Sequence, residues 1–362
     1  MTVTKQSDLD VFSNCSTVTG SITIGDTTET AISIPSNVQV IEGTLDIENN
    51  TVASIEAEGL INITAGAEFV NLSSLTTLNM PALTFIGSPQ AVYGLDFVDL
   101  PVLYNLSLPN LTEVGWLYII SINPSERFDV ELPTLGICWA EAVFQGITSL
   151  DISSLTYTLG PLSFWNIQEL DSLLAPSLTN VGGLLVGNSD GLTSLSFPSL
   201  AIINGSFNIT NDLALLDIPS GFPLLNTVGS MNLTGPFTTV SLPSLNQVNG
   251  DVYIQSSSSE FVCPIPQLKS DVINHGYTFY CGSISSSGNA DTGNTSNTAG
   301  GIVGGIFLLI LVAIIYSCCC RRNSQGRTNE VHNTGPLEHV NRALDRVEGG
   351  VIRGFAWFIS QM

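Results

Sequence analysis

The chain has 362 residues and a formal net charge of −22, with 44% hydrophobic and 11% charged residues. Up to Gly300 its only lysines and arginines are Lys5, Arg127 and Lys269, while 27 of the 31 acidic residues lie in the same part. Such a surface repels nucleic acid and anionic lipid, which excludes those partners. Acidity of this kind either keeps an extracellular protein soluble or serves to bind calcium or basic partners.

The first residues are polar and lead into a short helical pattern. No apolar segment of a signal peptide follows Met1, so we expect a mature or truncated chain, or a gene model without its first exon. Ser7 to Phe12 is predicted to form a capping helix, with Ser7 as its N-cap and acidic residues in its first turn. Cys15 follows, and its expected partner is a cysteine upstream of the printed sequence.

A repeat of roughly 20 to 25 residues fills the middle of the chain. Its marker is Pro-x-Leu, which begins at Pro81, Pro109, Pro133, Pro176, Pro198, Pro223 and Pro243, with Ser153 to Leu155 in the equivalent place between the third and fourth copies. Apolar residues alternate over short sets such as Leu45-x-Ile47 and Phe207-x-Ile209, which is a strand pattern. We therefore predict an all-β, right-handed β-solenoid of about ten coils with short capping helices.

The repeats hold few groups that catalysis requires. They contain no lysine and one arginine, Arg127, and they show no nucleophile elbow, phosphate loop or metal-ligand spacing, so we expect no cofactor and no enzyme. Carboxylate pairs remain: Glu56 with Glu58 would share a strand face, whereas Asp96 and Asp99 would point to opposite faces. We interpret them as solvated carboxylates.

Recurrent asparagines and clustered aromatic residues are the other features of the repeats. Asn123, Asn188 and Asn211 follow strands at equivalent points, where they are expected to bond turn backbone. Aromatic residues cluster in the central coils and form a candidate binding surface, because sugars stack on aromatic rings, although we expect most of them to belong to the core: Trp116, Tyr118, Trp139, Phe164 and Trp165. Cys138 is predicted to be a buried free thiol, with an intermolecular disulfide as the alternative.

Ten Asn-x-Ser/Thr sequons precede the hydrophobic segment and favour a secreted, glycosylated surface. The candidate glycosylation sites are Asn14, Asn49, Asn62, Asn71, Asn105, Asn110, Asn204, Asn208, Asn232 and Asn294.

The repeat region, residues 1–281, is predicted to end in a disulfide-bonded cap. Cys263 and Cys281 bracket a short helical pattern, Gln267 to Asn274, which Gly276 turns into a strand, and in an oxidising compartment these cysteines should pair. Residues 282–298 are mostly Ser, Gly, Asn and Thr, and they are expected to form a stalk.

Residues 299–320 are uncharged and long enough to cross a bilayer as a transmembrane helix. Arg321 and Arg322 follow, which places the repeats outside the cell and residues 321–362 in the cytoplasm. A GPI signal is the alternative, but it should end the precursor. Cys318, Cys319 and Cys320 are either palmitoylated or simply apolar residues at the membrane edge, and a helix over Pro336 to Ile352 would lie on the membrane or bind a partner.

Three motifs occur in order along the chain: the opening QSDLDVFSNCSTVTGSITI, the repeated Pro-Ser-Leu and Val-x-Gly turns, and the cap from Cys263 to Cys281. Together they resemble the fungal cell-wall organisation glycoproteins of the sporulation-specific and extracellular-mutant type, over about residues 5–281. The resemblance implies leucine-rich-like repeats similar to the receptor L domain, a GPI-anchored surface protein needed for wall integrity, and no enzymatic activity. It also implies that Cys15 is half of an N-terminal cap disulfide.

We therefore expect a non-enzymatic glycoprotein at the plasma membrane, with its ectodomain facing the cell wall. Its partner would be a wall polysaccharide or a wall or surface protein, which it binds or scaffolds. One alternative is a surface receptor or adhesin that signals through its cytoplasmic tail. A more distant alternative is a β-helix enzyme that modifies glucan.

Overall fold

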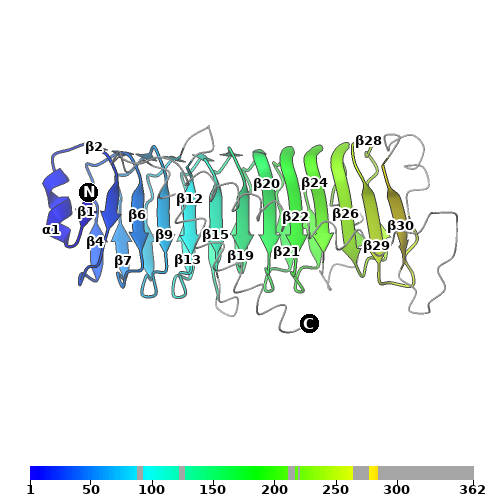
Figure 1. Cartoon of the computed structure of the whole chain (residues 1–362), viewed down its shortest axis with the longest axis horizontal. Helices are drawn as coiled ribbons and strands as arrows, with labels where there is room; N and C mark the ends of the chain where they lie inside the picture. The colour runs from blue at the N-terminus through cyan, green and yellow to red at the C-terminus, as the bar shows by residue number, and fades with distance from the viewer. Residues whose placement is uncertain (88–92, 122–126, 211–216, 219–220, 264–276, 284–362) are drawn as a thin grey trace, which may run out of the picture. The chain divides into compact units, whose positions relative to one another are not determined.

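A computed structural model describes residues 1–87, 93–121, 127–210, 217–218, 221–263 and 277–283. Met1 to Asn289 form one compact unit, and within its described residues the chain is all-β apart from one short α-helix and one 3-10 helix. Parallel strands stack in about eleven coils, from α1 at one end of this unit to β30 at the other (Figure 1). The β-solenoid predicted from the repeat is thus confirmed.

Each coil contributes strands to three faces. The first face is built from β2 (Thr17–Thr19), β5 (Val40–Glu42), β8 (Asn62–Ile63), β11 (Phe85–Ile86), β14 (Glu113–Val114), β17 (Ile137–Cys138), β28 (Gln247–Val248) and the first halves of β20 (Tyr157–Trp165), β22 (Asn180–Gly187), β24 (Ile202–Thr210) and β26 (Thr227–Gly235).

The second face continues the same sheet. It contains β1 (Thr2–Val3), β3 (Ile22–Ile24), β6 (Leu45–Glu48), β9 (Ala67–Val70), β12 (Leu95–Val98), β15 (Leu117–Ile120), β18 (Ala142–Gln145), the second halves of β20, β22, β24 and β26, and then β29 (Val252–Ser256) and β30 (Phe279–Ser283).

Short strands form the third face in four separate groups. They are β4 (Ala31–Ser33), β7 (Ser54–Glu56) and β10 (Thr77–Asn79); β13 (Asn105–Ser107), β16 (Asp129–Glu131) and β19 (Ser149–Asp151); β21 (Ser172–Leu174) and β23 (Ser194–Ser196); and β25 (Asp217–Ile218) and β27 (Thr239–Val240).

Alternating residues point into the core between these faces, as the short apolar sets predict. On β6, for example, Leu45 and Ile47 are fully buried, while Asp46 and Glu48 face outward. Aromatic residues of successive coils stack inside the core, with ring centroids 5.0 Å apart for Phe69 and Phe97. Each coil therefore buries its apolar side against the coils before and after it.

The Pro-x-Leu marker is a β-turn at the entrance to each coil. At Pro198 the amide of Leu200 donates to the carbonyl of Phe197 at 3.1 Å, which places proline at the second position of the turn and Leu200 in the core. Gly205 closes the same repeat, and a Cβ there would lie 2.5 Å from the carbonyl oxygen of Gly182 in the preceding coil. Proline and glycine thus recur for reasons of backbone geometry.

A column of residues with left-handed backbone ends successive strands of the second face. Asn188 has φ +54°, and the same conformation occurs at Asn49, Asn71, Asp99 and Asn166. Asn71 donates from its side-chain amide to the side-chain oxygen of Asn49 at 2.9 Å. The structural role predicted for Asn188 fits this column, whereas Asn123 and Asn211 lie outside the described residues.

The N-terminal cap is helical but starts earlier than predicted. The α-helix α1 spans Gln6–Leu9 and a 3-10 helix follows over Asp10–Phe12, so the N-cap is Lys5, and Ser7 lies inside the helix. The physical reason is Asp8, whose carboxylate accepts from the amides of Thr4 and Lys5 at 3.0 and 3.2 Å. Its third position in the helix lets it satisfy donors of the first turn.

At the other end, Cys263 and Cys281 form the predicted disulfide, with Cα atoms 5.8 Å apart. Cys281 lies on β30, so the strand expected after the cap is confirmed and continues to Ser283. The predicted helix over Gln267 to Asn274 lies outside the described residues.

The remaining predictions for the C-terminal part also fall outside the described residues. They concern the rest of the stalk, the span over 299–320, the three cysteines Cys318, Cys319 and Cys320, and the tail helix. Within the part of the chain that the structure describes, no helix is long and apolar enough to cross a membrane. The transmembrane helix therefore stays without structural support.

Candidate binding site on the second face

Five side chains gather on the outer surface of the second face, and we call them the Trp116 cluster: Glu68, Asp96, Trp116, Tyr118 and Glu141. Glu68 on β9, Asp96 on β12 and Tyr118 on β15 are register partners on three neighbouring strands. Trp116 and Glu141 immediately precede β15 and β18. Neighbouring strands lie about 4.8 Å apart, so the outward side chains of this row are in contact range.

The indole of Trp116 is positioned by a glycine in the preceding coil. A Cβ on Gly94 would lie 2.2 Å from the Trp116 carbonyl oxygen and 2.6 Å from its ring atom Cδ1. Because Gly94 has no side chain, the indole can fold back over the sheet, where its Nε1 donates to Oδ1 of Asp96 at 2.9 Å. The ring thus covers a carboxyl group that is itself only 8% exposed.

Burial raises the pKa of two neighbouring carboxyl groups. Desolvation raises the pKa of Asp96 to about 7, against the opposing effect of the hydrogen bond from Trp116. Desolvation, followed by repulsion from Asp96 and Asp46, raises the pKa of Glu68 to about 7 as well. Both groups therefore carry a proton over a much wider pH range than ordinary surface carboxyls do.

Tyr118 links the aromatic and acidic parts of the cluster. Its hydroxyl donates to Oε1 of Glu141, and its ring centroid lies 6.4 Å from that of Trp116. Burial, and then the hydrogen bond to Glu141, raise the pKa of the Tyr118 phenol. The hydroxyl therefore stays protonated and available as a hydrogen-bond group.

The other predicted aromatic residues lie elsewhere. Phe164 is fully buried and stacks on Phe144 with ring centroids 5.5 Å apart, so its assignment to a binding surface is wrong. Phe164 shares its side of β20 with the buried Leu162, so strand alternation places it inward. Trp165 faces outward over Gly187, where an added Cβ would lie 2.4 Å from the ring.

Trp139 also bonds a carboxylate, but on a different face. Its Nε1 donates to Oε2 of Glu113 at 3.0 Å, and Glu113 lies on β14 of the first face. Trp139 is therefore not a member of the Trp116 cluster. Its neighbour Cys138 is a buried free thiol, as predicted, and burial raises the pKa of that thiol to about 12.

The two carboxylate pairs considered from the sequence lie in different parts of the solenoid. Glu56 and Glu58 line one open surface hollow, and Glu56 accepts from Asn79 at 2.7 Å. Asp99 lies in the left-handed corner after β12 and does not face Asp96. The partner of Asp96 is instead Glu68 in the preceding coil, a residue that the sequence analysis missed.

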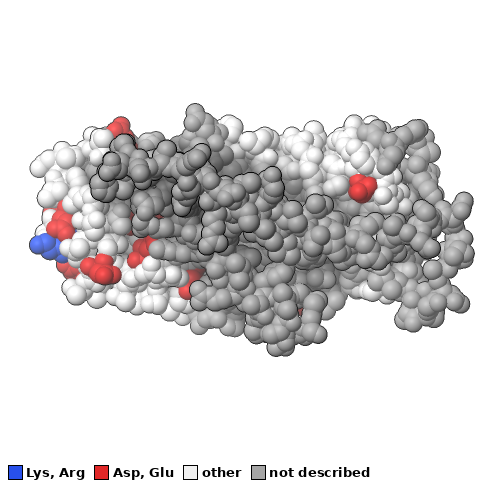
Figure 2. All heavy atoms as spheres, viewed as in Figure 1, with Lys and Arg blue, Asp and Glu red and all other residues white. Residues whose placement is uncertain are grey.

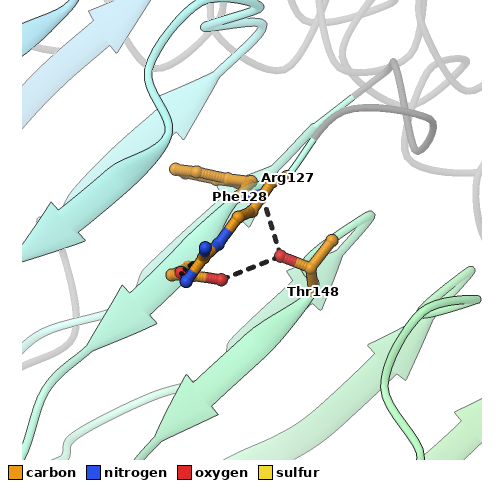
Figure 3. A network of polar contacts seen from close by, with 4 residues as sticks. Arg127, Phe128 and Thr148 are labelled. Atoms are coloured by element: carbon orange, nitrogen blue, oxygen red, sulfur yellow. Dashed lines mark hydrogen bonds and ion pairs between the residues drawn. The ribbon is translucent and has the colours of Figure 1, made fainter.

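The repeat region contains far fewer basic than acidic side chains. On the face seen in Figure 2, most of the visible acidic side chains lie towards the end that carries α1. Arg127 pairs with Asp129 at 2.5 Å, and Thr148 joins the network by donating to Asp129 and accepting from the Phe128 amide (Figure 3). This network lies on the third face, on β16, so Arg127 does not serve the Trp116 cluster. The described residues contain no group of His, Cys, Asp and Glu arranged to hold a metal ion.

The candidate glycosylation sites are mostly accessible. Six sequon asparagines are exposed, namely Asn14, Asn49, Asn71, Asn105, Asn110 and Asn204, and Asn62, Asn208 and Asn232 are half-buried. Asn294 lies outside the described residues. Glycosylation itself stays a prediction.

The raised pKa values predict that the protein loses stability as pH rises. A carboxyl whose folded-state pKa exceeds its unfolded value favours folding at low pH, and this contribution disappears as pH rises towards the folded value. Between about pH 4 and about pH 7 we expect a loss of several kcal/mol from Glu68 and Asp96 together, because raising a pKa by one unit corresponds to about 1.4 kcal/mol. Urea unfolding of wild type and of the double variant Glu68→Gln/Asp96→Asn measures it. The double variant should lack most of the loss, and an equal loss in both proteins would contradict the assignment.

Comparisons with known proteins place the chain in a family. Protein ecm33 of Aspergillus fumigatus is 30% identical over 319 residues, covering 78% of this chain and 79% of that protein. A cell surface GPI-anchored protein of Arthroderma benhamiae is 27% identical over 75% of this chain and 80% of its own length. Cell wall protein ecm33 of Schizosaccharomyces pombe is 35% identical over 78 residues, 22% of this chain and 17% of that protein. No family model and no solved structure matches. Extensive similarity to Aspergillus fumigatus ecm33, along most of both chains, shows that this chain belongs to the Ecm33 family of fungal cell-surface proteins.

Proposed function

We propose that this protein contributes to fungal cell-wall organisation as a non-enzymatic surface glycoprotein, by binding or scaffolding through its solenoid. The names of its relatives, a cell wall protein and a cell surface GPI-anchored protein, support the location and the process. The observation that carries the binding role is the Trp116 cluster, where two aromatic rings and three carboxyl groups meet on one flat sheet face.

The electrostatics of the cluster favour binding over glycoside hydrolysis. A glycosidase of the usual type needs one protonated and one ionised carboxyl, so the environments of the pair must move their pKa values apart. Desolvation instead moves the pKa of Glu68 and of Asp96 in the same direction, to about 7 in each case. Neither carboxyl is held ionised as a nucleophile or base at acidic pH.

Scaffolding is supported by the length of uninterrupted stacking. The large parallel sheet that forms the first and second faces extends from β1 to β30, and a disulfide fixes its last strand. Each coil of such a solenoid is stabilised by its neighbours, and the stacked coils together present extended surfaces for binding.

We propose that the protein is anchored at the plasma membrane with the solenoid on the outer side. The name of the relative from Arthroderma benhamiae favours a GPI anchor over the span at residues 299–320. The uncharged segment would then belong to the signal that anchor attachment removes.

The wall function is tested with the isosteric double variant Glu68→Gln/Asp96→Asn. A strain without the gene should be sensitive to wall stress, and wild type and the double variant should restore growth equally, because amides preserve shape and hydrogen bonding. An inactive double variant that is well folded and reaches the surface would contradict the claim that Glu68 and Asp96 act as uncharged hydrogen-bond groups. A deletion strain with a normal wall would remove the function altogether.

The anchor is tested on intact membranes with phosphatidylinositol-specific phospholipase C. We expect the enzyme to release the glycosylated solenoid into the soluble fraction, since cleavage of a GPI anchor leaves no membrane segment. Retention of the protein in the membrane, with a reference GPI protein released in the same sample, would instead support the helix at 299–320.

A further inference from the structure

We propose that the Trp116 cluster is a subsite for a neutral, extended polysaccharide chain that lies along the solenoid axis across β9, β12 and β15. The proposal rests on the proposed binding function and specifies the chemical class of its ligand. Its basis is the arrangement of three rows of outward side chains on these strands.

The rows follow from the strand register. The first row holds Gly66, Gly94 and Trp116; the second holds Glu68, Asp96 and Tyr118; and the third holds Val70, Val98 and Ile120. The third row is half-buried, as are Trp116 and Tyr118. The face therefore carries polar groups between an aromatic edge and an aliphatic edge.

Such a face matches the two kinds of surface on a sugar ring. The C–H face of a pyranose packs on aromatic and aliphatic groups, here Trp116 and the row of Val98. Its hydroxyls can exchange hydrogen bonds with the carboxyl of Glu68 and with the Tyr118 hydroxyl, while Asp96, which Trp116 covers, holds the indole in place. Glu68 accepts no hydrogen bond from any other described residue, so its carboxyl has capacity for a ligand.

Charge narrows the ligand to a neutral polysaccharide. An anionic chain would meet carboxyl groups, while Arg127 is paired with Asp129 on the third face. A cationic chain would need ionised carboxylates, yet burial favours the uncharged form of Glu68 and Asp96. Protonated carboxyls donate and accept hydrogen bonds without charge, which suits hydroxyl groups.

The orientation follows from the spacing of the strands. Equivalent side chains recur about every 4.8 Å along the axis. A polysaccharide chain that runs along the axis can therefore place successive sugars over successive members of these rows. A chain crossing the strands in this way repeats the same contacts, whereas a chain running parallel to them would meet the cluster only once.

The distribution of sequons leaves this part of the face open. No sequon asparagine lies on β9, β12 or β15, and the exposed Asn71 follows β9 directly, at the Val70 end of the third row. Further along the same outward row, Asn208 on β24 and Asn232 on β26 are sequon asparagines. Glycans at Asn208 and Asn232 would lie further along the second face and would leave Asp96 and Tyr118 uncovered.

The test uses the full-length glycosylated protein in detergent, titrated calorimetrically at mildly acidic pH. The probes are laminarin as a neutral β-glucan, chitosan as a cationic polymer and polygalacturonate as an anionic one. We expect laminarin to bind, and the dissociation constant to rise about tenfold or more in Trp116→Ala, because the ring supplies the main apolar contact. Trp116→Phe should recover much of the affinity, which separates loss of the ring from loss of folding.

Trp139→Ala is the matched control. It also removes a half-buried indole that donates to a carboxylate, but on the first face, and its affinity for laminarin should stay within about twofold of wild type.

Three results would overturn the site: no binding of laminarin by wild type, an equal loss in Trp116→Ala and Trp139→Ala, or tighter binding of chitosan than of laminarin. These failures differ from a failure of the proposed function. Full rescue of the deletion strain by Trp116→Ala would remove the site and leave the wall function standing. A deletion strain with a normal wall would remove the function itself.

Discussion

Backbone hydrogen bonds between successive coils are the interaction on which the rest of the structure depends. At the candidate site the Ala67 amide donates to the Gly94 carbonyl at 2.9 Å, Leu95 to Trp116 at 2.9 Å, and Leu117 to Glu141 at 3.0 Å. These bonds fix the register of β9, β12, β15 and β18. Register in turn decides which side chains share an outward row, so the chemistry of the surface is a consequence of the ladder.

The ladder also explains the unusual state of the carboxyl groups. Because Glu68 and Asp96 are register partners, ionising one of them places a negative charge next to the other. Trp116 also covers Asp96, because Gly94 leaves room for the indole. Ionising both groups would place two charges on a partly dry surface. The same geometry that weakens them as acids leaves them as uncharged hydrogen-bond groups between apolar edges, which is the character expected of a surface for hydroxyl-rich ligands.

Much of this fold was predictable because it depends on local rules. Pro-x-Leu predicts a turn from the fixed φ of proline, alternating apolar residues predict strands, and two cysteines around the last coil predict a cap. The site was less predictable because it depends on register between coils. Along the chain the carboxylate nearest to Asp96 is Asp99, but its neighbour across the sheet is Glu68, in the preceding coil. The inward position of Phe164 follows from local alternation, because Phe164 shares its side of β20 with the buried Leu162.

The central claim is that stacking of the coils keeps Glu68 and Asp96 uncharged beside Trp116 well above the pH at which surface carboxyls ionise. Infrared difference spectroscopy of the carboxylic acid C=O stretch tests it directly, with Glu68→Gln and Asp96→Asn assigning the bands. The account predicts that both bands persist at about pH 6 and disappear by about pH 8, each being absent from its own variant. Loss of all protonated carboxyl signal by about pH 5 would contradict it.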